Sequence, residues 1–308
     1  MLEQVAVQEP EKRRAERAGA RPDAPGRTSR RRISTLQIVS VVVATVVVGY
    51  LLLPFFWMLK SAFQAPAEIT SIPPVWVPTD PSTENFRQAL AMMPFGRQMM
   101  NSLLVAGVAA AGTAVVASMA AYVTSRFRMR ITGIVLGVFI FNQLVPEITR
   151  LFPVYFLLER LNLVNTYTGM ILTYMGFMLP FAVLVLHGYF QDSCPKTLEE
   201  AAYVDGCSHF GAFFRVFLPV SRAGILSIVC VVFLQIWNDF IWASTLLYQG
   251  EKTMLQVGLR SFFGQGGAVE YMGPFMAACV LTMLPAVFLF VFVQRYMVSG
   301  LSGGAVKG

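Results

Sequence analysis

The sequence Glu199-Glu200-Ala201-Ala202-Tyr203-Val204-Asp205-Gly206, which continues to Val216-Phe217-Leu218-Pro219, is a polar segment between two hydrophobic stretches. Each of these stretches is long enough to cross a bilayer as a helix, which takes roughly 20 apolar residues. A turn between two membrane helices rarely carries such a specific mixture of acidic, small and aromatic side chains. We therefore expect the rest of the chain to form helices that move when this segment is displaced.

The composition indicates that lipid is the main solvent of the chain. Of the 308 residues, 56% are hydrophobic and only 13% are charged, whereas soluble domains carry roughly a quarter charged residues. The apolar residues fall into six runs, at 36–59, 99–124, 132–157, 167–190, 223–247 and 273–297. Backbone groups in lipid must be hydrogen-bonded within their own segment, so these runs are predicted to be helices. The prediction is an all-α membrane protein with six transmembrane helices.

The distribution of Lys and Arg predicts the orientation in the membrane. Residues 1–35, the 125–131 turn, the 191–222 loop and the C-terminal end from Arg295 onward would share one side, and they hold 9, 3, 3 and 2 of the 24 Lys and Arg residues. Positive residues in short loops favour the cytoplasmic side, so both termini are predicted to be cytoplasmic. The net charge of +7 follows from this topology and gives no reason to expect nucleic acid as a partner.

Several kinds of site are not expected in this chain. The four cysteines (Cys194, Cys207, Cys230 and Cys279) have neither metal nor redox spacing, and a disulfide framework is not expected. The sequence contains no G-x-x-x-x-G-K-[ST], G-x-S-x-G or H-E-x-x-H motif. We therefore expect no catalytic residues, no bound metal and no nucleotide site in this chain.

Three regions follow from this pattern. Residues 1–35 are rich in Arg, Ala, Pro and Glu and are predicted to be a disordered basic tail, with a role at the lipid surface as the alternative. Residues 36–298 form the predicted transmembrane domain, which includes the 191–222 loop. Residues 299–308 form a small-residue tail.

The second span is dense in small residues, from Ala106 to Ala121. Small residues allow helix backbones to approach closely, so this helix is predicted to lie in the middle of the bundle. The preceding 60–98 loop contains six prolines. It is predicted to be an irregular outer segment with short helices at most.

The third span carries polar groups, among them Asn142. Gln143, Glu147 and Arg150 have helical spacing and would share one face. Counted along a continuous helix, Glu147 lies about 22 Å from the inner surface. An ionisable residue at such a depth is a candidate for the substrate pathway. The alternative is a Glu147–Arg150 pair that only neutralises itself.

The fifth span carries a second polar stripe, formed by Gln235, Asn238, Asp239 and Trp242. On a continuous helix Asp239 would lie about 24 Å from the inner surface, level with Glu147. A carboxylate, amides and an indole on one face suit a sugar, because hydroxyl groups need fixed hydrogen bonds and the C–H face of a pyranose stacks on aromatic rings. The alternative is hydrogen bonding between helices that only holds the bundle together.

At the opening stretch the chain resembles a known family. Glu200-Ala201-Ala202, Gly206, Val216 and Leu218-Pro219 stand at the spacing of the inner-membrane permeases of binding-protein-dependent ABC importers. The Asp205-Gly206 pair is similar to the carbohydrate-uptake branch. The smaller permease subunit of maltose-type importers is resembled by Asn101-Ser102-Leu103, Trp237-Asn238-Asp239 and the sequence from Gln294 to Gly308. The chain departs from the pattern at Cys207, where Ala is frequent, and at Ala223, where proline is frequent.

The resemblance implies a type I ABC importer permease fold in a bacterial plasma (inner) membrane, with a cytoplasmic coupling helix in the 191–222 loop. The implied partners are a second homologous permease, a cytoplasmic ATPase dimer that uses ATP and Mg²⁺, an extracytoplasmic sugar-binding protein and the lipid bilayer. This chain would bind no cofactor of its own.

The resemblance also implies roles for named residues. The ATPase-coupling set is Glu199, Glu200, Ala201, Ala202, Asp205, Gly206, Phe210, Phe213, Phe214, Leu218 and Pro219, in which Glu200 would face a basic residue of the ATPase and the three phenylalanines would form a docking face. The loop that contacts the binding protein would hold Phe263, Gly264, Gln265, Gly266 and Tyr271. The tail that contacts the ATPase would hold Gly304, Val306 and Lys307.

The expected function is the permease subunit of an ATP-driven sugar importer, for a mono- or oligosaccharide. One alternative is an ABC permease for another polyol-like solute such as a glycerophosphate. Two alternatives of other classes are a proton-coupled carrier that uses Glu147 and Asp239, and an intramembrane enzyme.

Overall fold

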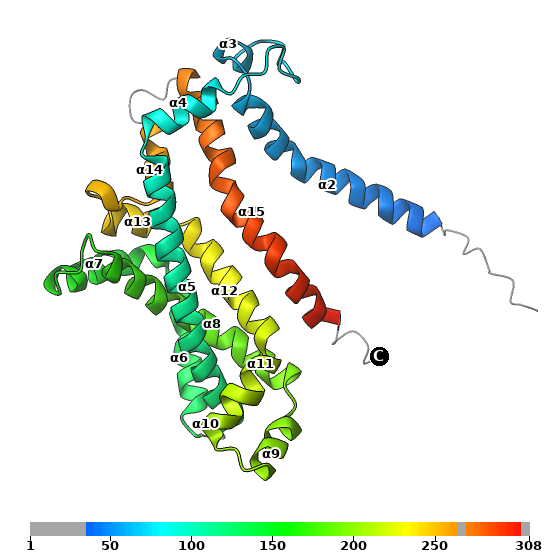
Figure 1. Ribbon diagram of the computed structural model, residues 1–308, viewed down its shortest axis with the longest axis vertical. Helices are drawn as coiled ribbons and strands as arrows, with labels where there is room; N and C mark the ends of the chain where they lie inside the picture. The colour runs from blue at the N-terminus through cyan, green and yellow to red at the C-terminus, as the bar shows by residue number, and fades with distance from the viewer. Residues whose placement is uncertain (1–34, 128, 264–268, 303–308) are drawn as a thin grey trace, which may run out of the picture. The chain divides into compact units, whose positions relative to one another are not determined.

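The structure is a computed structural model that describes residues 35–127, 129–263 and 269–302 (Figure 1). Its contacts divide the chain into two units, residues 1–53 and residues 54–308, and each is described by itself. All regular elements in the described ranges are helical, which confirms the predicted all-α class. The predicted basic tail, up to residue 34, and the last six residues lie outside these ranges.

Helix α2 (Thr35–Ala62) corresponds to the first predicted span. Its residues up to Leu53 form the described part of the first unit. Apolar residues such as Val41, Val46 and Leu51 occupy every face of this segment, so a helix here needs apolar surroundings on all sides.

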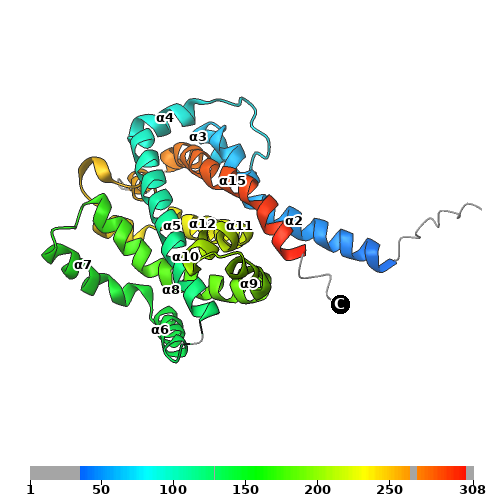
Figure 2. The same ribbon diagram turned by 60° about the horizontal axis from the view of Figure 1, so that its bottom comes forward.

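In the second unit, helix α5 (Phe95–Arg126) is the central element, as its small residues predict. It packs along α8 (Tyr167–Ser193) and α12 (Arg222–Trp237), and α15 (Met272–Ser302) packs on α12 (Figures 1 and 2). The residues of α5 buried in these contacts are mostly small: Ala106, Ala109, Ala110, Thr113, Ala114, Ala117, Ser118 and Ala121. The lack of long side chains along this face lets three helices approach one another closely.

A glycine sets the approach of α8 to α12. A Cβ atom at Gly224 would overlap the ring of Tyr189. The two helices can therefore keep this separation only with glycine at position 224.

One end of α5 carries the irregular segments. The 60–98 loop contains the short helices α3 (Pro66–Ile69) and α4 (Glu84–Met92), as predicted. The segment after α13 (Ile241–Leu246) forms a turn η3 (Gly250–Lys252), α14 (Leu255–Gly258), and the turns η4 (Leu259–Phe263) and η5 (Val269–Tyr271).

Asn101 and Ser102 at the start of α5 fix this second loop. Asn101 Nδ2 donates to the carbonyls of Glu251 and Thr253 at 2.8 and 3.0 Å, and Ser102 Oγ accepts from the Leu255 N–H at 2.8 Å. These two residues therefore hold the backbone of the 250–258 segment onto α5.

The third predicted span is not one helix, which corrects the sequence-based expectation. Helix α6 (Thr132–Leu144) ends before Pro146, and a turn η1 (Glu147–Arg150) then leads into α7 (Leu151–Arg160), with a bend of 102° between the two parts. Val145 is extended (φ −75°, ψ 121°), because a residue that precedes proline is disfavoured in the helical region. Gln143 and Glu147 therefore do not share a helical face, and the depth counted along a continuous helix is wrong.

The fifth predicted span is also broken. Helix α12 ends at Trp237, and α13 (Ile241–Leu246) begins after three non-helical residues. The side chains of two residues at the break form hydrogen bonds with nearby backbone groups. Asn238 Nδ2 donates to the Leu234 carbonyl at 2.8 Å, and Asp239 Oδ2 accepts from the Ala243 N–H at 3.0 Å. Such local bonds compete with the helical ladder, so the stripe from Gln235 to Trp242 does not lie on one helix.

By length and composition, four helices in the described ranges can cross a membrane: α2, α5, α8 and α15. Counting two bent pairs, α6 with η1–α7 and His209–Val220 with α12, raises the number to six. In the described residues, four of the six predicted spans are therefore single helices, and the third and the fifth are broken.

Candidate functional site

The 191–222 loop folds into a compact helical hairpin at the Arg126 end of α5 (Figure 1). Helix α9 (Lys196–Val204) is followed by Gly206, whose φ of +83° is a conformation that favours glycine. The N–H groups of Gly206 and Cys207 bond back to the carbonyls of Tyr203 and Ala202 at 3.0 and 2.9 Å. This is a Schellman cap, which satisfies the last carbonyls of α9 and reverses the chain.

The second half of the hairpin begins at Ser208, whose Oγ caps the Gly211 N–H at 3.2 Å. Helix α10 (His209–Ala212) runs into a π-helical turn, Phe213–Phe217, and then α11 (Leu218–Val220). Leu218 is half-buried and Pro219 is exposed. The residues that resemble the known family therefore lie at the two ends of one hairpin, Glu200-Ala201-Ala202 in its first helix and Leu218-Pro219 in its last.

The residues of α9 divide between two faces. Glu200, Ala201 and Asp205 are exposed, whereas Glu199 and Ala202 are buried. Neighbouring residues of a helix point about 100° apart, so the two adjacent glutamates cannot face the same side. Glu200 is free for an outside partner, and Glu199 faces its own bundle.

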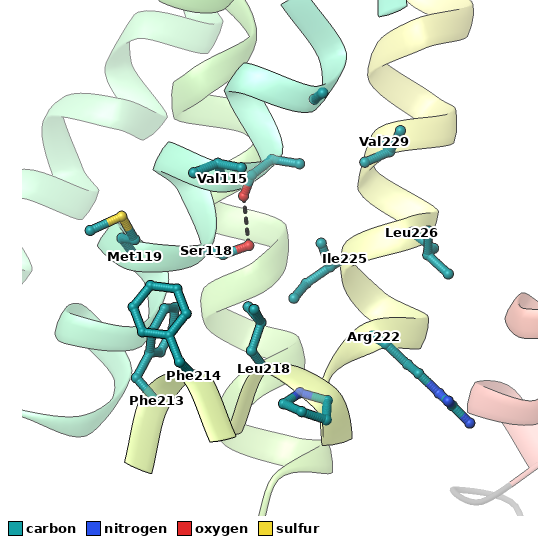
Figure 3. A pocket seen from close by; sticks show the side chains of 13 residues that line it. Val115, Ser118, Met119, Phe213, Phe214, Leu218, Arg222, Ile225, Leu226 and Val229 are labelled. Atoms are coloured by element: carbon teal, nitrogen blue, oxygen red, sulfur yellow. Dashed lines mark hydrogen bonds between the residues drawn. The ribbon is translucent and has the colours of Figure 1, made fainter. Parts of the chain in front are cut away.

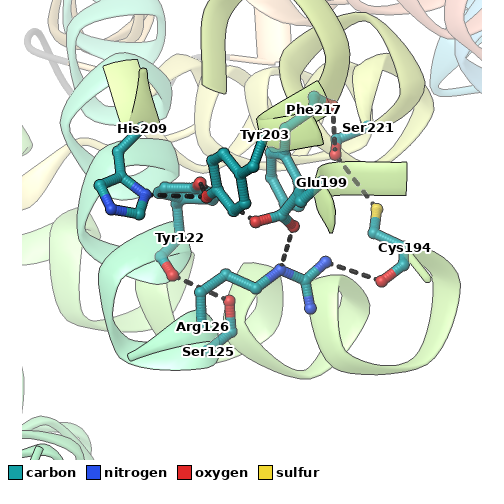
Figure 4. Close-up of polar contacts among 9 residues, drawn as sticks. All are labelled: Tyr122, Ser125, Arg126, Cys194, Glu199, Tyr203, His209, Phe217 and Ser221. Carbon is teal, nitrogen blue, oxygen red and sulfur yellow. Dashed lines mark hydrogen bonds and ion pairs between the residues drawn. The ribbon is translucent and has the colours of Figure 1, made fainter. Parts of the chain in front are cut away.

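Glu199 makes a buried ion pair with Arg126 at the end of α5 (Figure 4). Arg126 Nε donates to Glu199 Oε1 at 2.5 Å, and the two side chains are 6% and 7% exposed. Arg126 also donates from Nη2 to the Cys194 carbonyl at 2.7 Å, and Tyr122 donates its hydroxyl proton to Glu199 Oε2 at 3.1 Å. Removing one member of a buried pair costs about 3–5 kcal/mol, because the other charge is left unpaired.

Further polar contacts extend this pair across the loop. On one side, the hydroxyl oxygen of Tyr203 lies 3.4 Å from the hydroxyl oxygen of Tyr122 and 2.9 Å from His209 Nδ1. On the other side, Cys194 Sγ lies 3.2 Å from Ser221 Oγ, at the start of α12. Burial raises the pKa of the Cys194 thiol. The polar chain joins α5, the end of α8, α9, α10 and the start of α12.

The sequence did not indicate this network. In the sequence, Arg126 belongs to the positively charged 125–131 turn that predicts the topology, and Glu199 belongs to the set expected to couple to the ATPase. The available signal was the spacing of Glu199 and Ala202, which are i and i+3 and share the buried face of α9.

The three phenylalanines of the loop do not form one docking face, which corrects the expectation. Phe213 is only 5% exposed and packs on Tyr122, with ring centroids 4.8 Å apart. Phe210 and Phe214 are 68% and 45% exposed and contact each other at 4.7 Å. The π-helical turn rotates Phe213 inward, so Phe210 and Phe214 alone are available to an outside partner.

An apolar groove of about 530 Å³ lies between α5, the loop and α12 (Figure 3). Its walls come from all three elements: Val115, Ser118 and Met119 of α5, Phe213, Phe214, Leu218 and Pro219 of the loop, and Arg222, Ile225, Leu226 and Val229 of α12. Ser118 Oγ donates its proton to the Ala114 carbonyl of the same helix at 2.6 Å, so it presents no free donor to the groove. The groove is therefore suited to an apolar side chain or lipid tail and not to a sugar.

The two helix breaks meet at a second cluster. Trp242 donates its indole N–H to a Glu147 carboxylate oxygen, and the Tyr174 hydroxyl donates to Asp239 Oδ2 at 2.7 Å. Trp242 is 1% exposed and its ring lies 4.5 Å from that of Phe177. Glu147 and Asp239 are thus brought together by the folded chain, although not along the helices that the spacing predicts.

The other polar candidates lie at the ends of α6 and α12, next to the two breaks. Arg150 donates to Asn142 Oδ1 at 3.1 Å, and the described ion pairs do not include a Glu147–Arg150 pair. Gln143, Gln235 and Asn238 are exposed.

Two predicted contact regions are described only in part. Phe263 is exposed and packs on Phe275 at 4.7 Å, and Tyr271 is half-buried. Gly264, Gln265 and Gly266 lie outside the described residues, as do Gly304, Val306 and Lys307.

Comparison with known families matches residues 113–303 to the family described as binding-protein-dependent transport system inner membrane component. The chain belongs to this family. The permease is therefore a multi-pass transport protein and not an enzyme, because its relatives are transport permeases. Systems of this family depend on a substrate-binding protein, and ABC systems contain an ATPase.

Individual relatives cover most of the permease. It is 35% identical over 268 residues to the diacetylchitobiose uptake system permease protein of Streptomyces coelicolor, covering 87% of this chain and 96% of that protein. It is 32% identical over 260 residues to the sulfoquinovosyl glycerol transport system permease protein of Agrobacterium fabrum, covering 83% and 89%.

Among solved structures, a chain of a bacterial ABC transporter that imports the acidic polysaccharide alginate superimposes with a TM-score of 0.73 at 20% identity, covering 89% of the permease and 99% of that chain. This likeness supports the fold.

Proposed function

We propose that the permease is one of two homologous permease subunits of an ATP-driven sugar importer. The observation that carries this proposal is the capped hairpin of α9 and α10, which presents Glu200, Phe210 and Phe214 outward while Glu199 and Phe213 fix it to α5. The substrates named for several relatives support a carbohydrate: diacetylchitobiose, sulfoquinovosyl glycerol and, for a Bacillus subtilis permease at 28% identity, melibiose, raffinose and stachyose.

In this proposal the loop couples the permease to a cytoplasmic ATPase dimer that hydrolyses ATP with Mg²⁺. Both termini are cytoplasmic. Glu200 forms an ion pair with a basic residue of the ATPase, and Phe210 with Phe214 fills an apolar part of its cleft. Closure of the ATPase dimer on ATP would draw the two hairpins of the permease pair together. Gly304, Val306 and Lys307 would contact the ATPase, and the segment from Phe263 to Tyr271 would contact the extracytoplasmic sugar-binding protein.

The sugar pathway would pass the two helix breaks. Asn142, Gln143, Glu147, Gln235, Asn238 and Asp239 surround this region, and their carboxylates and amides can hydrogen-bond to hydroxyl groups. Broken helices with polar groups near the middle of a bundle are typical of transport sites. Trp242 is buried, so we assign it the positioning of Glu147.

The test is purification of the tagged permease from membranes of its own host, followed by mass spectrometry and uptake into liposomes loaded with ATP. We expect an ABC ATPase and a second permease to co-purify. The uptake panel contains diacetylchitobiose, melibiose, maltose and trehalose, with glycerol 3-phosphate as the polyol alternative. ATP-independent uptake that collapses with the proton gradient would instead support a proton-coupled carrier and refute the importer.

A further inference from the structure

The ion pair between Arg126 and Glu199 differs from the other ion pairs in the described part of the chain. The pairs Arg87–Glu84 and Arg97–Glu251 are between exposed side chains, and exposed ion pairs contribute little to the stability of a fold. In the Arg126–Glu199 pair both side chains are buried, and the two residues, 73 positions apart in the sequence, belong to different helices. It therefore restricts how α9 can move relative to α5.

Both partners have additional bonds that fix their orientation. Glu199 accepts from Tyr122 with its second carboxylate oxygen, and Arg126 holds the Cys194 carbonyl with a second nitrogen. Separating α9 from α5 would leave both charges and the Tyr122 hydroxyl without these partners at once, while Arg126 would keep its bond to the Cys194 carbonyl at the end of α8. The separation is therefore much less favourable than a joint displacement of both helices.

Helix α5 reaches the opposite end of the bundle. It packs on α8 and α12, and its first turns hold the 250–258 segment through Asn101 and Ser102. A displacement of α9 that carries α5 with it would therefore reach the segment next to the predicted binding-protein contact.

We propose that Arg126 and Glu199 are positioning residues that make α9 and α5 one mechanical unit, so that movement of the loop is transmitted along α5. This inference rests on the proposed coupling of the loop to an ATPase. It assigns transmission to residues other than Glu200, Phe210 and Phe214, which would make the contact with the ATPase itself.

The first measurement tests transmission. Glu199→Gln keeps the size of the side chain and removes its charge, and Glu84→Gln removes an exposed ion pair as the matched control. In the purified complex in liposomes we expect Glu199→Gln to keep the ATPase subunit and ATP hydrolysis, but to lower sugar uptake per ATP at least fivefold. Glu199→Asp should recover part of the loss, and Glu84→Gln should match the unmodified permease.

The second measurement tests the rigid unit and needs no sugar. Spin-labelled unnatural amino acids at Val204 of α9 and Val123 of α5, both exposed, report the distance between the helices. We expect the same distance with and without ATP and vanadate in the unmodified complex, and a changed distance with ATP and vanadate in Glu199→Gln.

The outcomes separate the two proposals. A tagged permease that retains no ATPase refutes the proposed function. An intact complex in which Glu199→Gln leaves uptake per ATP and the label distance unchanged refutes the inference alone. Uptake and hydrolysis that fall in the same proportion would also refute it, because they would indicate only loss of folded complex.

Discussion

Glu199 and Glu200 are neighbours with different surroundings, and the difference follows from helix geometry. Glu199 is buried against Arg126 and Tyr122, whereas Glu200 is exposed. Replacing each in turn therefore separates two functions of one loop. Loss of Glu199 should act inside the permease, and loss of Glu200 should act on the contact with the ATPase.

At Glu200 we predict that Glu200→Ala lowers recovery of the ATPase with the tagged permease at least tenfold and abolishes uptake. Membrane insertion should be unchanged, because the side chain has no contact that the fold needs. Quantitative co-purification checks this, with the yield of membrane-inserted permease as the control. Normal ATPase recovery together with normal uptake would exclude Glu200 from docking.

At Cys194 we predict slow reaction with a maleimide. Burial raises the pKa of its thiol, so at any pH below that value less reactive thiolate is present than for an ordinary cysteine. Cys207 is half-buried on the same hairpin and serves as the internal comparison. Mass spectrometry of labelled peptides at pH 7 to 8 should show Cys207 modified first. Equal rates would mean that the polar chain around Cys194 opens readily.

At the scale of the elements, the breaks in the third and fifth spans were only partly predictable. Pro146 accounts for the end of α6, but not for the size of the bend, because a proline restricts the preceding residue without determining where the chain turns next. No proline marks the second break. There the side chains of Asn238 and Asp239 form hydrogen bonds with the backbone that compete with the helical ones. In the sequence alone, the spacing of the same residues is equally compatible with a polar stripe on a continuous helix.

For this second break we predict that Asp239→Asn lowers the initial rate of sugar uptake several-fold while the ATPase still co-purifies. The amide retains one acceptor but loses the charge that Tyr174 and the Ala243 N–H stabilise at the start of α13. Uptake rate and complex yield are the measurements. An unchanged rate would reduce the cluster to a packing role.

The close approach of α8 and α12 gives a prediction on stability. Gly224→Ala should lower the free energy of unfolding by about 1–3 kcal/mol, the typical cost of overpacking, because the new methyl group meets the Tyr189 ring. Gly176→Ala on α8 has open space around it and is the matched control. Thermal unfolding in detergent compares the two. Equal melting temperatures would show that Tyr189 moves away without cost.

For the whole molecule, the sequence predicted the fold class and the central position of α5, and its resemblance to a known family implied a helix in the 191–222 loop. These depend on local composition and spacing. The Arg126–Glu199 pair and the meeting of Trp242 with Glu147 could not be predicted, because each joins residues far apart in the chain. Such pairings are set by how whole helices pack.

The predicted topology is tested at this scale. With both termini cytoplasmic, a cysteine introduced at Val204 should react with an impermeant reagent only after the cells are opened. One introduced at Val77 should react in intact spheroplasts, since both positions are well exposed but lie at opposite ends of the bundle. The native cysteines replaced by alanine provide the background. The opposite pattern would reverse the orientation.

The polar chain around Arg126 also bears on the construction of hybrid permeases. The recognisable motif ends at Pro219, but Glu199 finds its cation and its hydroxyl donor on α5, at Arg126 and Tyr122. A loop transplanted from another permease would leave its own partners behind, and Arg126 and Tyr122 would remain buried opposite a foreign side chain. A working chimaera should therefore exchange the last turns of α5 together with the loop. The unit to exchange consists of two segments that are far apart in the sequence.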